Sequence, residues 1–349
     1  MTSSLDELGG WPAIFGALAA GENLAGATAE AVLNVILSGD ATEGQIGAFT
    51  MGLLAKGETA DEISGMVNAM RSAQTPLKVD DEAIDIVGMG GSPQRRKAAL
   101  NVSTMACFIA SAAGAVICKH GNRKASSTSG SFDLLEALGI HFELTPEQLQ
   151  AVVADSGVGF AFAKAYHPAL RHAGPVRTQL GVRTVFNTLG PLANPARVTR
   201  QVVGIADSSL APTMIDVLEA TGSVHSWVVS GHGSLDEIAL DGPTLVHSLR
   251  NGEKETFTLN PADYDMSAPP AGALDGGDAA ANAAILGRLL DGETGPIRDI
   301  VILNAAAGLV VADIAADLAE GIEAANSAID SGAAKAKLED HTAAANSHR

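Results

Sequence analysis

The pattern of apolar and polar positions changes once along the chain, near Asp80. Before that residue, apolar side chains recur at helical spacing over residues 27–37 and 43–55, and a glycine soon follows each segment. A capping box that begins at Thr59 predicts another helix. No strand pattern occurs in this part of the chain, so the sequence predicts a small, all-helical unit.

Beyond Asp80, short apolar runs alternate with segments of helical spacing. The runs are apolar at consecutive positions, which is typical of strands buried on both faces. Alternating buried strands and helices indicate a larger α/β domain with a mainly parallel central sheet flanked by helices. The predicted strands cover residues 84–87, 115–118, 158–163, 201–205 and 226–230, and Ala-rich helices are expected over 278–290, 298–311 and 313–331.

Three other segments have less regular patterns. Residues 167–181 have the spacing of one continuous helix. Residues 187–195 contain two prolines and a glycine, so we expect a rigid loop there. After about Glu339 we expect little more than a frayed tail.

Composition limits the classes of partner. The chain carries 22 Lys and Arg against 40 Asp and Glu, for a formal net charge of −18. A nucleic acid or an anionic membrane needs clustered positive charge, so neither is expected as a partner. Cys107 and Cys118 form no metal-ligand pattern and suit a reducing compartment, which favours a cytoplasmic protein. No segment predicts a signal peptide or a membrane span.

Clusters of small polar residues lie at the ends of the predicted strands, where open α/β sheets bind ligands. Gly88–Gly91 follows a strand, although such a turn often serves packing alone. Asn101, Ser103 and Thr104 begin a helix, and helix N-termini commonly bind anions. Lys119–Arg123 follows the next predicted strand and combines cations with amide and imidazole groups, so it indicates a ligand site more strongly.

Charged residues suggest further candidates. Pro93–Lys97, the most basic run of this acidic chain, fits a solvated loop and a flexible arm over a phosphate about equally well. Asp236 and Glu237 are adjacent carboxylates of a kind that is often inert, but beside a phosphate site they are candidate Mg²⁺ ligands. The sequence contains no Ser-His-Asp, Cys-His or HExxH pattern, so no catalytic residue is assigned. We expect the site to position and neutralise its ligands.

A cationic group lies within the helix expected over residues 167–181. It consists of His167, Arg171, His172 and Arg177, and at helical spacing several of these side chains lie near one another. A guanidinium suits bidentate binding of a carboxylate. A solvated basic face explains the same residues without a ligand.

Several longer segments carry a resemblance to a known family. They are QIGAFTMGLLAKGET (Gln45–Thr59), KHGNRKASSTSGSFDLLEALGI (Lys119–Ile140), HPALRHAGPVRTQLGVRTVFNTLGPLANPA (His167–Ala196), LDEI (Leu235–Ile238) and GGDAAANAAIL (Gly276–Leu286). Together they resemble the anthranilate phosphoribosyltransferase family, among the nucleoside phosphorylase-like phosphoribosyltransferases. The resemblance runs nearly end to end.

The resemblance implies a homodimer that forms through a small helical domain, with the site in the cleft beside a larger α/β domain. The helical domain is expected to comprise residues 1–79 with about 168–190, and the α/β, PRPP-binding domain residues 80–167 and 191–349. The implied reaction is the Mg²⁺-dependent transfer of phosphoribose from phosphoribosyl pyrophosphate (PRPP) to anthranilate. It gives N-(5-phosphoribosyl)anthranilate and pyrophosphate, a step of tryptophan biosynthesis.

The resemblance also assigns roles to the polar residues at the strand ends. The PRPP site is expected to include Gly88, Gly90, Gly91, Ser92, Asn101, Ser103, Thr104 and Lys119. The anthranilate site is expected to include Gly90, His120, Asn122, His167 and Arg177, with Arg177 on the carboxylate. Mg²⁺ is expected at Ser103, Asp236 and Glu237.

The loop after the first predicted strand departs from the family pattern. The family has GTGGDG followed shortly by TFNIST, whereas this chain has GMGGSP, QRRKAA and LNVST, with Met89 for threonine and Ser92 for aspartate. We hypothesise that Arg95, Arg96 and Lys97 replace the lost contacts with phosphate. Two alternatives stay open: a paralogue with another acceptor, or a non-catalytic homologue that binds PRPP or another ligand.

Overall fold

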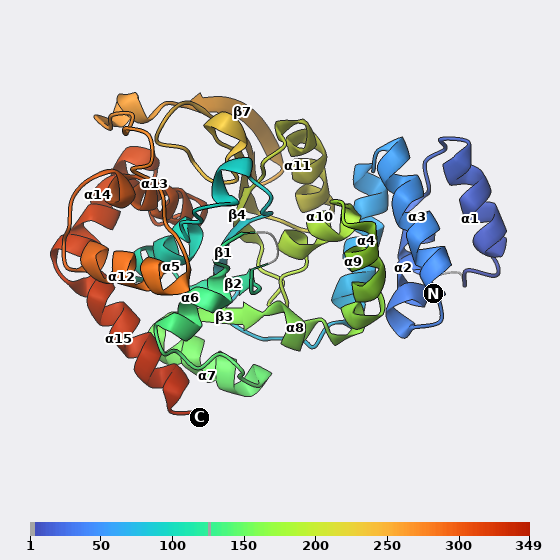
Figure 1. The fold of residues 1–349 in the computed structure, drawn as a ribbon, viewed down its shortest axis with the longest axis horizontal. Coiled ribbons are helices and arrows are strands. Elements are labelled where there is room, and N and C mark those ends of the chain that lie inside the picture. Colours follow the sequence, from blue (N-terminus) through green and yellow to red (C-terminus); the bar gives the residue numbers. More distant parts are fainter. Residues whose placement is uncertain (1–3, 125–126) are drawn as a thin grey trace.

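The computed structural model describes residues 4–124 and 127–349. The N-terminal helices lie together on one side of the molecule, and an α/β unit occupies the other side (Figure 1). These helices are α1 (Gly10–Ala19), α2 (Gly26–Ser38), α3 (Glu43–Lys56) and α4 (Ala60–Ala73). Thr42 and Thr59 begin α3 and α4, each through a reciprocal capping box with the residue three positions on.

A single sheet runs through the α/β unit, with the strand order β3-β2-β1-β4-β5-β6-β7. The strands are β1 (Ile84–Gly88), β2 (Ile117–Gly121), β3 (Val158–Phe162), β4 (Arg200–Gly204), β5 (His225–Ser230), β6 (Thr244–Arg250) and β7 (Glu253–Leu259). From β3 to β5 in this order the pairs are parallel, while β6 and β7 add antiparallel pairs. This confirms the predicted mainly parallel central sheet.

Helices cover both faces of this sheet. The helices of this part of the chain are α5 (Val102–Ala112), α6 (Ser131–Ala137), α7 (Pro146–Ser156), α8 (Ala163–Tyr166), α9 (Gly174–Leu180), α10 (Val185–Leu192), α11 (Ala211–Ala220), α12 (Ala279–Leu290), α13 (Pro296–Val311), α14 (Leu318–Asp330) and α15 (Ala333–Asn346). Those that contact the strands of the sheet include α5, α7, α11 and α13. Along β1, Ile86 packs in the core formed with α5 and α13, whereas Val87 faces the opposite core. Successive strand residues point to opposite faces, so this strand is apolar on both. None of the helices described for residues 4–124 and 127–349 has the length and apolar character required to cross a membrane.

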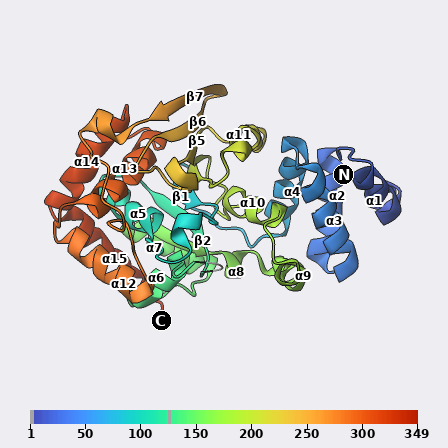
Figure 2. The ribbon, with the colours of Figure 1, turned by 45° about the horizontal axis from the view of Figure 1, so that its top comes forward.

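The N-terminal helices share a core with one face of the sheet. Val87, Val203 and Val228 of the sheet lie in the same apolar cluster as the buried residues of α2 and α4. Figure 2 shows α10 and α11 between the sheet and α4, and both helices contact α4. The helical unit therefore packs on the sheet through a continuous apolar layer.

The segment that follows β3 differs from its prediction. Residues 167–181 are not one helix: a 3₁₀ helix covers Pro168–His172, and α9 begins separately at Gly174. Proline is best tolerated in the first turn of a helix and interrupts one that would continue through it, and each of these two short helices has a proline in its first turn. Most of the expected rigid loop over 187–195 belongs to α10, which ends one residue after Pro191.

Two boundaries also differ. β2 runs from Ile117 to Gly121, so Lys119 and His120 are strand residues rather than residues that follow a strand. The expected tail after Glu339 is instead part of α15. His341 of this helix is buried, and its ring lies 5.8 Å from that of Phe108 and 5.3 Å from that of Phe160. Burial of this face keeps the terminal helix ordered, and the alanine-rich pattern alone did not indicate it.

Candidate active site

A cleft opens where the strand order reverses, at the carboxyl ends of β1 and β4. These two strands are neighbours, although the chain passes from β1 to β2 and β3 on the other side of β1. Open α/β sheets bind ligands at such a switch point, because the loops diverge there. The cleft has a volume of about 840 Å³, and its wall opposite the strand ends includes residues of α9.

Nearly all of the predicted site residues border this cleft. His167 is the exception: it lies behind His120, with the two ring centroids 5.0 Å apart. The bordering residues are Gly88, Gly90, Gly91, Ser92, Asn101, Ser103, Thr104, Lys119, His120, Asn122, Arg177, Asp236 and Glu237. The fold therefore brings together residues of β1, α5, β2, α9 and the loop after β5, while the ligand of each stays a prediction.

Glycines end β1 and β4 beneath the two carboxylates. A Cβ atom on Gly88 would lie 2.7 Å from Asp236 Oδ2, and one on Gly204 would clash with the backbone oxygen of Asp236. A larger residue at either strand end would therefore displace the carboxylate segment. Sequence reasoning missed Gly204, although β4 ends in Val-Gly as β1 does, and that repetition was the available signal.

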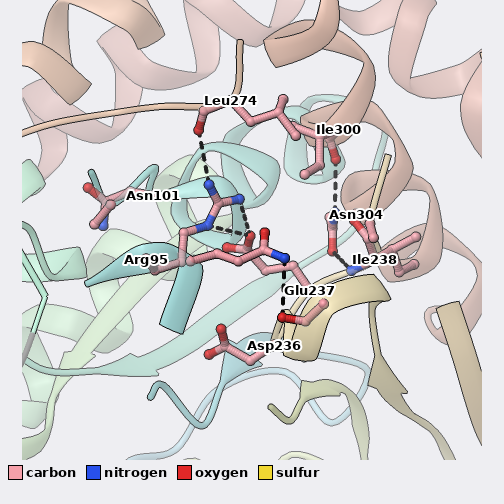
Figure 3. A network of polar contacts seen from close by, with 12 residues as sticks. Arg95, Asn101, Asp236, Glu237, Ile238, Leu274, Ile300 and Asn304 are labelled. Carbon is pink, nitrogen blue, oxygen red and sulfur yellow. Dashed lines mark hydrogen bonds and ion pairs between the residues drawn. The ribbon is translucent and has the colours of Figure 1, made fainter. Parts of the chain in front are cut away.

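Asp236 and Glu237 follow β5 and are almost buried, with 8% and 9% of their surface exposed. The backbone N–H of Gly90 donates a hydrogen bond of 2.7 Å to Asp236 Oδ2. Asn304 of α13 holds the next residue, Ile238, by accepting from its N–H at 2.9 Å and donating to its carbonyl at 3.0 Å (Figure 3). Backbone contacts and a core asparagine thus fix the carboxylates at the cleft.

The two carboxylates have the properties of cation ligands. Burial raises the pKa of Asp236, and it raises the pKa of Glu237 to about 7, although Arg95 opposes the latter rise. A buried carboxylate pair is costly unless a cation accompanies it. Within the described residues no three His, Cys, Asp or Glu side chains form a metal cluster. Two adjacent carboxylates that border the cleft are hard oxygen ligands, so the pair fits a metal such as Mg²⁺, which completes its shell with water and phosphate oxygens.

Lys119 is a buried cation of β2, with 3% of its surface exposed. Its ammonium donates to the carbonyl oxygen of Ile86 and, at 3.2 Å, to Ser103 Oγ. Burial raises the pKa of the nearby Asp85 to about 6, and Lys119 opposes this rise. Asn194 donates a hydrogen bond of 2.9 Å to the Asp85 carboxylate. Sequence reasoning missed Asp85, because a polar residue inside an apolar strand carries no motif. It also missed Asn194, which lies after α10 in the family-specific segment His167–Ala196.

His120 is buried beside Lys119 and is neutral at pH 7, since burial first and His167 second lower its pKa to about 3. Its Nδ1 lies 3.0 Å from the carbonyl oxygen of Gly190, so we assign the proton to Nδ1 and the lone pair to Nε2. His120 Nε2 and Ser92 Oγ are buried atoms without a hydrogen-bond partner among the described residues. Both residues border the cleft, so a ligand bound there is a candidate partner for these atoms.

Two arginines reach the cleft from the opposite wall. The Arg177 guanidinium of α9 lies 5.6 Å from the ring centre of Phe186, and no described residue accepts a hydrogen bond from it. Burial lowers the pKa of Arg177, but a guanidinium stays charged at pH 7. Arg183, which sequence reasoning missed, donates to the carbonyl oxygen of Gly90. It lies in the same family-specific segment as Arg177, which was the signal that could have found it.

The other members of the predicted cationic group point elsewhere. His167 Nε2 lies 2.8 Å from a backbone carbonyl oxygen, and burial lowers the pKa of this imidazole to about 4. Arg171 donates to the carbonyl of the same 3₁₀ helix at 3.2 Å and is exposed. His172 packs against the end of α2. Of the four residues, Arg177 alone borders the cleft, because the break between the two short helices separates them.

Asn101 and the first turn of α5 form another wall of the cleft. The backbone N–H of Asn101 donates to Asn282 Oδ1 at 2.9 Å, and Asn101 Oδ1 accepts from Ser129 Oγ at 2.7 Å. Asn282 of α12 also donates to the carbonyl oxygen of Ala99 at 2.8 Å. Asn282 therefore holds in place the end of the loop that leads into α5. This contact gives a structural reason for the family-like segment Gly276–Leu286.

The first half of the basic run after β1 is held against the carboxylate segment, whereas Arg96 and Lys97 are exposed. Arg95 donates to Glu237 Oε2 from Nη2 at 2.6 Å and from Nε at 3.2 Å, and its Nη1 donates to the carbonyl oxygen of Leu274 at 3.0 Å (Figure 3). Gln94 donates to the carbonyl oxygens of residues 232–233 at 3.3 and 3.2 Å. Arg95 thus contacts a carboxylate, whereas the sequence suggested a contact with phosphate.

These features identify a class of protein. A parallel sheet presents its strand ends to a cleft with a buried lysine, a carboxylate pair and polar atoms that lack partners in the described chain. Such an arrangement is typical of α/β proteins that bind a phosphate-bearing ligand together with a divalent cation.

Comparison with known proteins gives the family. Residues 12–73 match the family described as "Glycosyl transferase family, helical bundle domain", and residues 80–335 match "Glycosyl transferase family, a/b domain". The chain is 46% identical over 325 residues to the anthranilate phosphoribosyltransferase of Rhodopseudomonas palustris (strain TIE-1). The aligned residues make up 93% of this chain and 95% of that relative. The chain belongs to the anthranilate phosphoribosyltransferase family of glycosyl transferases.

Solved structures from this family share the fold over nearly the whole chain. Anthranilate phosphoribosyltransferase from Thermus thermophilus superimposes with a TM-score of 0.89 at 39% identity, covering 95% of this chain and 99% of that one. The Saccharomyces cerevisiae enzyme in complex with PRPP and Mg has a TM-score of 0.87 at 27% identity, with 97% and 98% covered. The same yeast enzyme was also solved with 4-fluoroanthranilate, with a TM-score of 0.86 at 26% identity and the same coverage.

Proposed function

We propose that this chain transfers phosphoribose from PRPP to anthranilate in a Mg²⁺-dependent step of tryptophan biosynthesis. The observation that carries the proposal is the convergence of Lys119, the Asp236–Glu237 pair and Arg177 on one cleft, in a member of the anthranilate phosphoribosyltransferase family. The yeast relative, solved with PRPP and Mg and with 4-fluoroanthranilate, supports the choice of ligands. The products are N-(5-phosphoribosyl)anthranilate and pyrophosphate.

PRPP would bind along the strand ends and the first turn of α5. Gly90 and Gly91 have φ values of 72° and 88°, a left-handed backbone that turns N–H groups toward an anion. Ser92 Oγ lacks a partner among the described residues and can donate to a phosphate oxygen. The remaining contacts are assigned to Gly88, Asn101, Ser103, Thr104 and Lys119, which border the same cleft.

Asp236 and Glu237, with Ser103, would hold Mg²⁺. Two buried carboxylates and a hydroxyl are hard oxygen ligands of the kind that Mg²⁺ prefers. When bound, the metal supplies positive charge that stabilises the departing pyrophosphate. Lys119 adds a second fixed positive charge from within the sheet.

Anthranilate would bind between β2 and α9. The Arg177 guanidinium would donate two hydrogen bonds to its carboxylate in a bidentate arrangement, and Asn122 and His120 border the same cleft. His120 is neutral, so its Nε2 can accept a hydrogen bond from the aromatic amine and orient it. His167 would act behind His120, by packing against its ring.

The reaction breaks the bond between C1′ of PRPP and a pyrophosphate oxygen and forms a bond between C1′ and the amine nitrogen. The nitrogen supplies the electron pair and releases one proton to water, and pyrophosphate leaves with the electrons of the broken bond. An arylamine is already neutral at pH 7, so attack requires no strong general base. The protein would therefore act through orientation and electrostatic stabilisation.

We also propose a cytoplasmic homodimer that forms through the helical unit, residues 1–79 with about 168–190. Met51 and Leu54 of α3 support this, since they are 38% and 37% exposed on that unit although both are large and apolar. Light scattering after size exclusion is expected to give twice the mass of the chain. A mass of one chain at micromolar concentration would contradict the dimer.

The activity is tested with purified protein, PRPP, Mg²⁺ and anthranilate, followed by the loss of anthranilate fluorescence. We expect loss only when all three are present, and mass spectrometry should identify N-(5-phosphoribosyl)anthranilate. Turnover of another aromatic amine in place of anthranilate would instead favour a paralogue. PRPP binding without turnover of any acceptor would favour a ligand-binding homologue.

A further inference from the structure

We propose that Arg95 is a tethered cation that competes with the divalent cation for Glu237 and so weakens metal binding before PRPP arrives. The inference rests on the proposed role of Asp236 and Glu237 as metal ligands. It assigns a function to the loop in which this chain departs from its family's pattern.

The Arg95 guanidinium is built into the carboxylate site. Its Nη2 and Nε lie 2.6 and 3.2 Å from Glu237 Oε2, and its Nη1 lies 3.0 Å from the carbonyl oxygen of Leu274. The side chains of Arg95 and Glu237 are only 12% and 10% exposed. Since each guanidinium nitrogen has a protein partner, Arg95 is committed to this site and is not available to phosphate in this arrangement.

The ion pair changes the charge and the free oxygens that a metal meets. Asp236 and Glu237 together carry two negative charges when ionised, and Arg95 neutralises one of them. Asp236 Oδ2 already accepts from Gly90 N–H, and Glu237 Oε2 accepts from Arg95. A divalent cation therefore meets carboxylates of which only one oxygen each is without a hydrogen bond in the described residues, together with a guanidinium that repels it.

The loop that carries Arg95 is attached lightly enough for exchange. It forms only a three-residue 3₁₀ turn, Pro93–Arg95, and Arg96 and Lys97 are exposed. Apart from Arg95, the turn is held to the carboxylate side by the two long hydrogen bonds of Gln94, at 3.2 and 3.3 Å. Arg95 can thus leave Glu237 without disturbing the sheet, and the negative charge of PRPP would then favour both cations.

The test measures Mn²⁺ binding to the full chain without PRPP, by electron paramagnetic resonance of the free ion. Arg95→Gln should tighten the Mn²⁺ dissociation constant roughly tenfold, equivalent to about 1.4 kcal/mol. Arg96→Gln is the matched control, because it removes the same charge from the next, exposed residue, and it should stay within about twofold of the wild type. An Arg95→Gln constant equal to or weaker than that of Arg96→Gln overturns the proposal.

Glu237→Gln separates this inference from the metal role on which it rests. We expect this variant to bind Mn²⁺ more weakly than the wild type. Unchanged affinity in Glu237→Gln would remove the metal role itself, whereas weaker affinity there with no gain in Arg95→Gln would remove only the competition.

A measurement on the wild-type chain does not depend on how the variants fold. Saturating Mn²⁺ should displace Arg95 from Glu237 and release the loop. Trypsin is then expected to cleave after Arg95, Arg96 or Lys97 several times faster than in the metal-free protein. An unchanged or slower cleavage rate contradicts the proposal.

Discussion

Two cations face the same cleft and are held in different ways. Lys119 lies on a strand inside the sheet, and its ammonium donates to a core carbonyl oxygen and to Ser103. Arg95 lies on a short turn at the surface and reaches a carboxylate across the cleft edge. The sheet thus fixes a charge that serves both fold and site, while the loop holds a charge that a ligand can displace.

Replacement of Lys119 is expected to have the largest effect, since the buried Asp85 would lose its compensating cation. Lys119→Met should reduce the free energy of unfolding by about 3 kcal/mol at pH 7, measured by urea denaturation. Lys97→Met, which removes a lysine from the exposed loop, should change it by less than about 0.5 kcal/mol. Equal losses of unfolding free energy in the two variants would mean that the buried Lys119 stabilises the fold no more than the exposed Lys97 does.

Arg177→Gln tests the wall of the cleft that faces the sheet. Loss of a charged pair with the anthranilate carboxylate should lower kcat/KM for anthranilate roughly 100-fold, with a much smaller effect on KM for PRPP. Arg171→Gln, on the same segment but directed away from the cleft, should leave both values within about twofold. A similar loss for both substrates would mean that Arg177 does not distinguish the acceptor.

The buried imidazole of His120 makes the strand side of the cleft sensitive to acid. Its pKa of about 3 in the folded protein lies below the ordinary 6.5, so the unfolded state binds the proton first as the pH falls. The neutral imidazole contributes fully to the free energy of unfolding above pH 6.5. This contribution is lost as the pH falls toward 3, at up to about 1.4 kcal/mol per pH unit. His120→Asn should therefore flatten the fall in unfolding free energy between pH 7 and 5 by about 2 kcal/mol.

The control for this pH dependence is His232→Asn, which changes an exposed imidazole at the loop side of the cleft. If both variants change the slope of unfolding free energy against pH equally, the slope does not report on the buried imidazole. If His120→Asn keeps the wild-type slope, His120 is not the buried neutral group described here.

The smallest effect is expected from Gln94→Ala, on the loop side. The variant loses two long hydrogen bonds to backbone carbonyls and should cost less than about 1 kcal/mol of unfolding free energy. Urea denaturation measures the change, and Gln179→Ala, which removes an exposed glutamine that also makes one long contact, is the matched control. A loss of several kcal/mol in Gln94→Ala alone would mean that the loop is firmly fixed, against the contrast with the sheet.

Much of the fold could be predicted because the parallel strands contain short apolar runs and several helices begin with a readable capping signal, such as that of Thr59. The end of β2 was not predictable in this way. Lys119 and His120 are polar but buried, so the apolar run stops before the strand does. α15 was missed because small alanines and His341 form its docked face, and none of them marks a helix end.

The candidate site divides in the same way. Glycines, hydroxyls and cations directly after strands could be predicted from residue type, because parallel strands bring their carboxyl ends to one edge. The contact between Arg95 and Glu237 joins residues 142 positions apart, and it depends on a loop path that no local pattern specifies. The sequence therefore indicated the ligand class, whereas the partner of the basic loop required the structure.

The most direct test of the account measures both products of one reaction. Purified protein with PRPP and Mg²⁺ should consume anthranilate and release pyrophosphate in equal amounts, and omission of anthranilate should reduce pyrophosphate release to background. Pyrophosphate release without anthranilate consumption, or no reaction with either substrate, would contradict the proposal that this cleft joins the two.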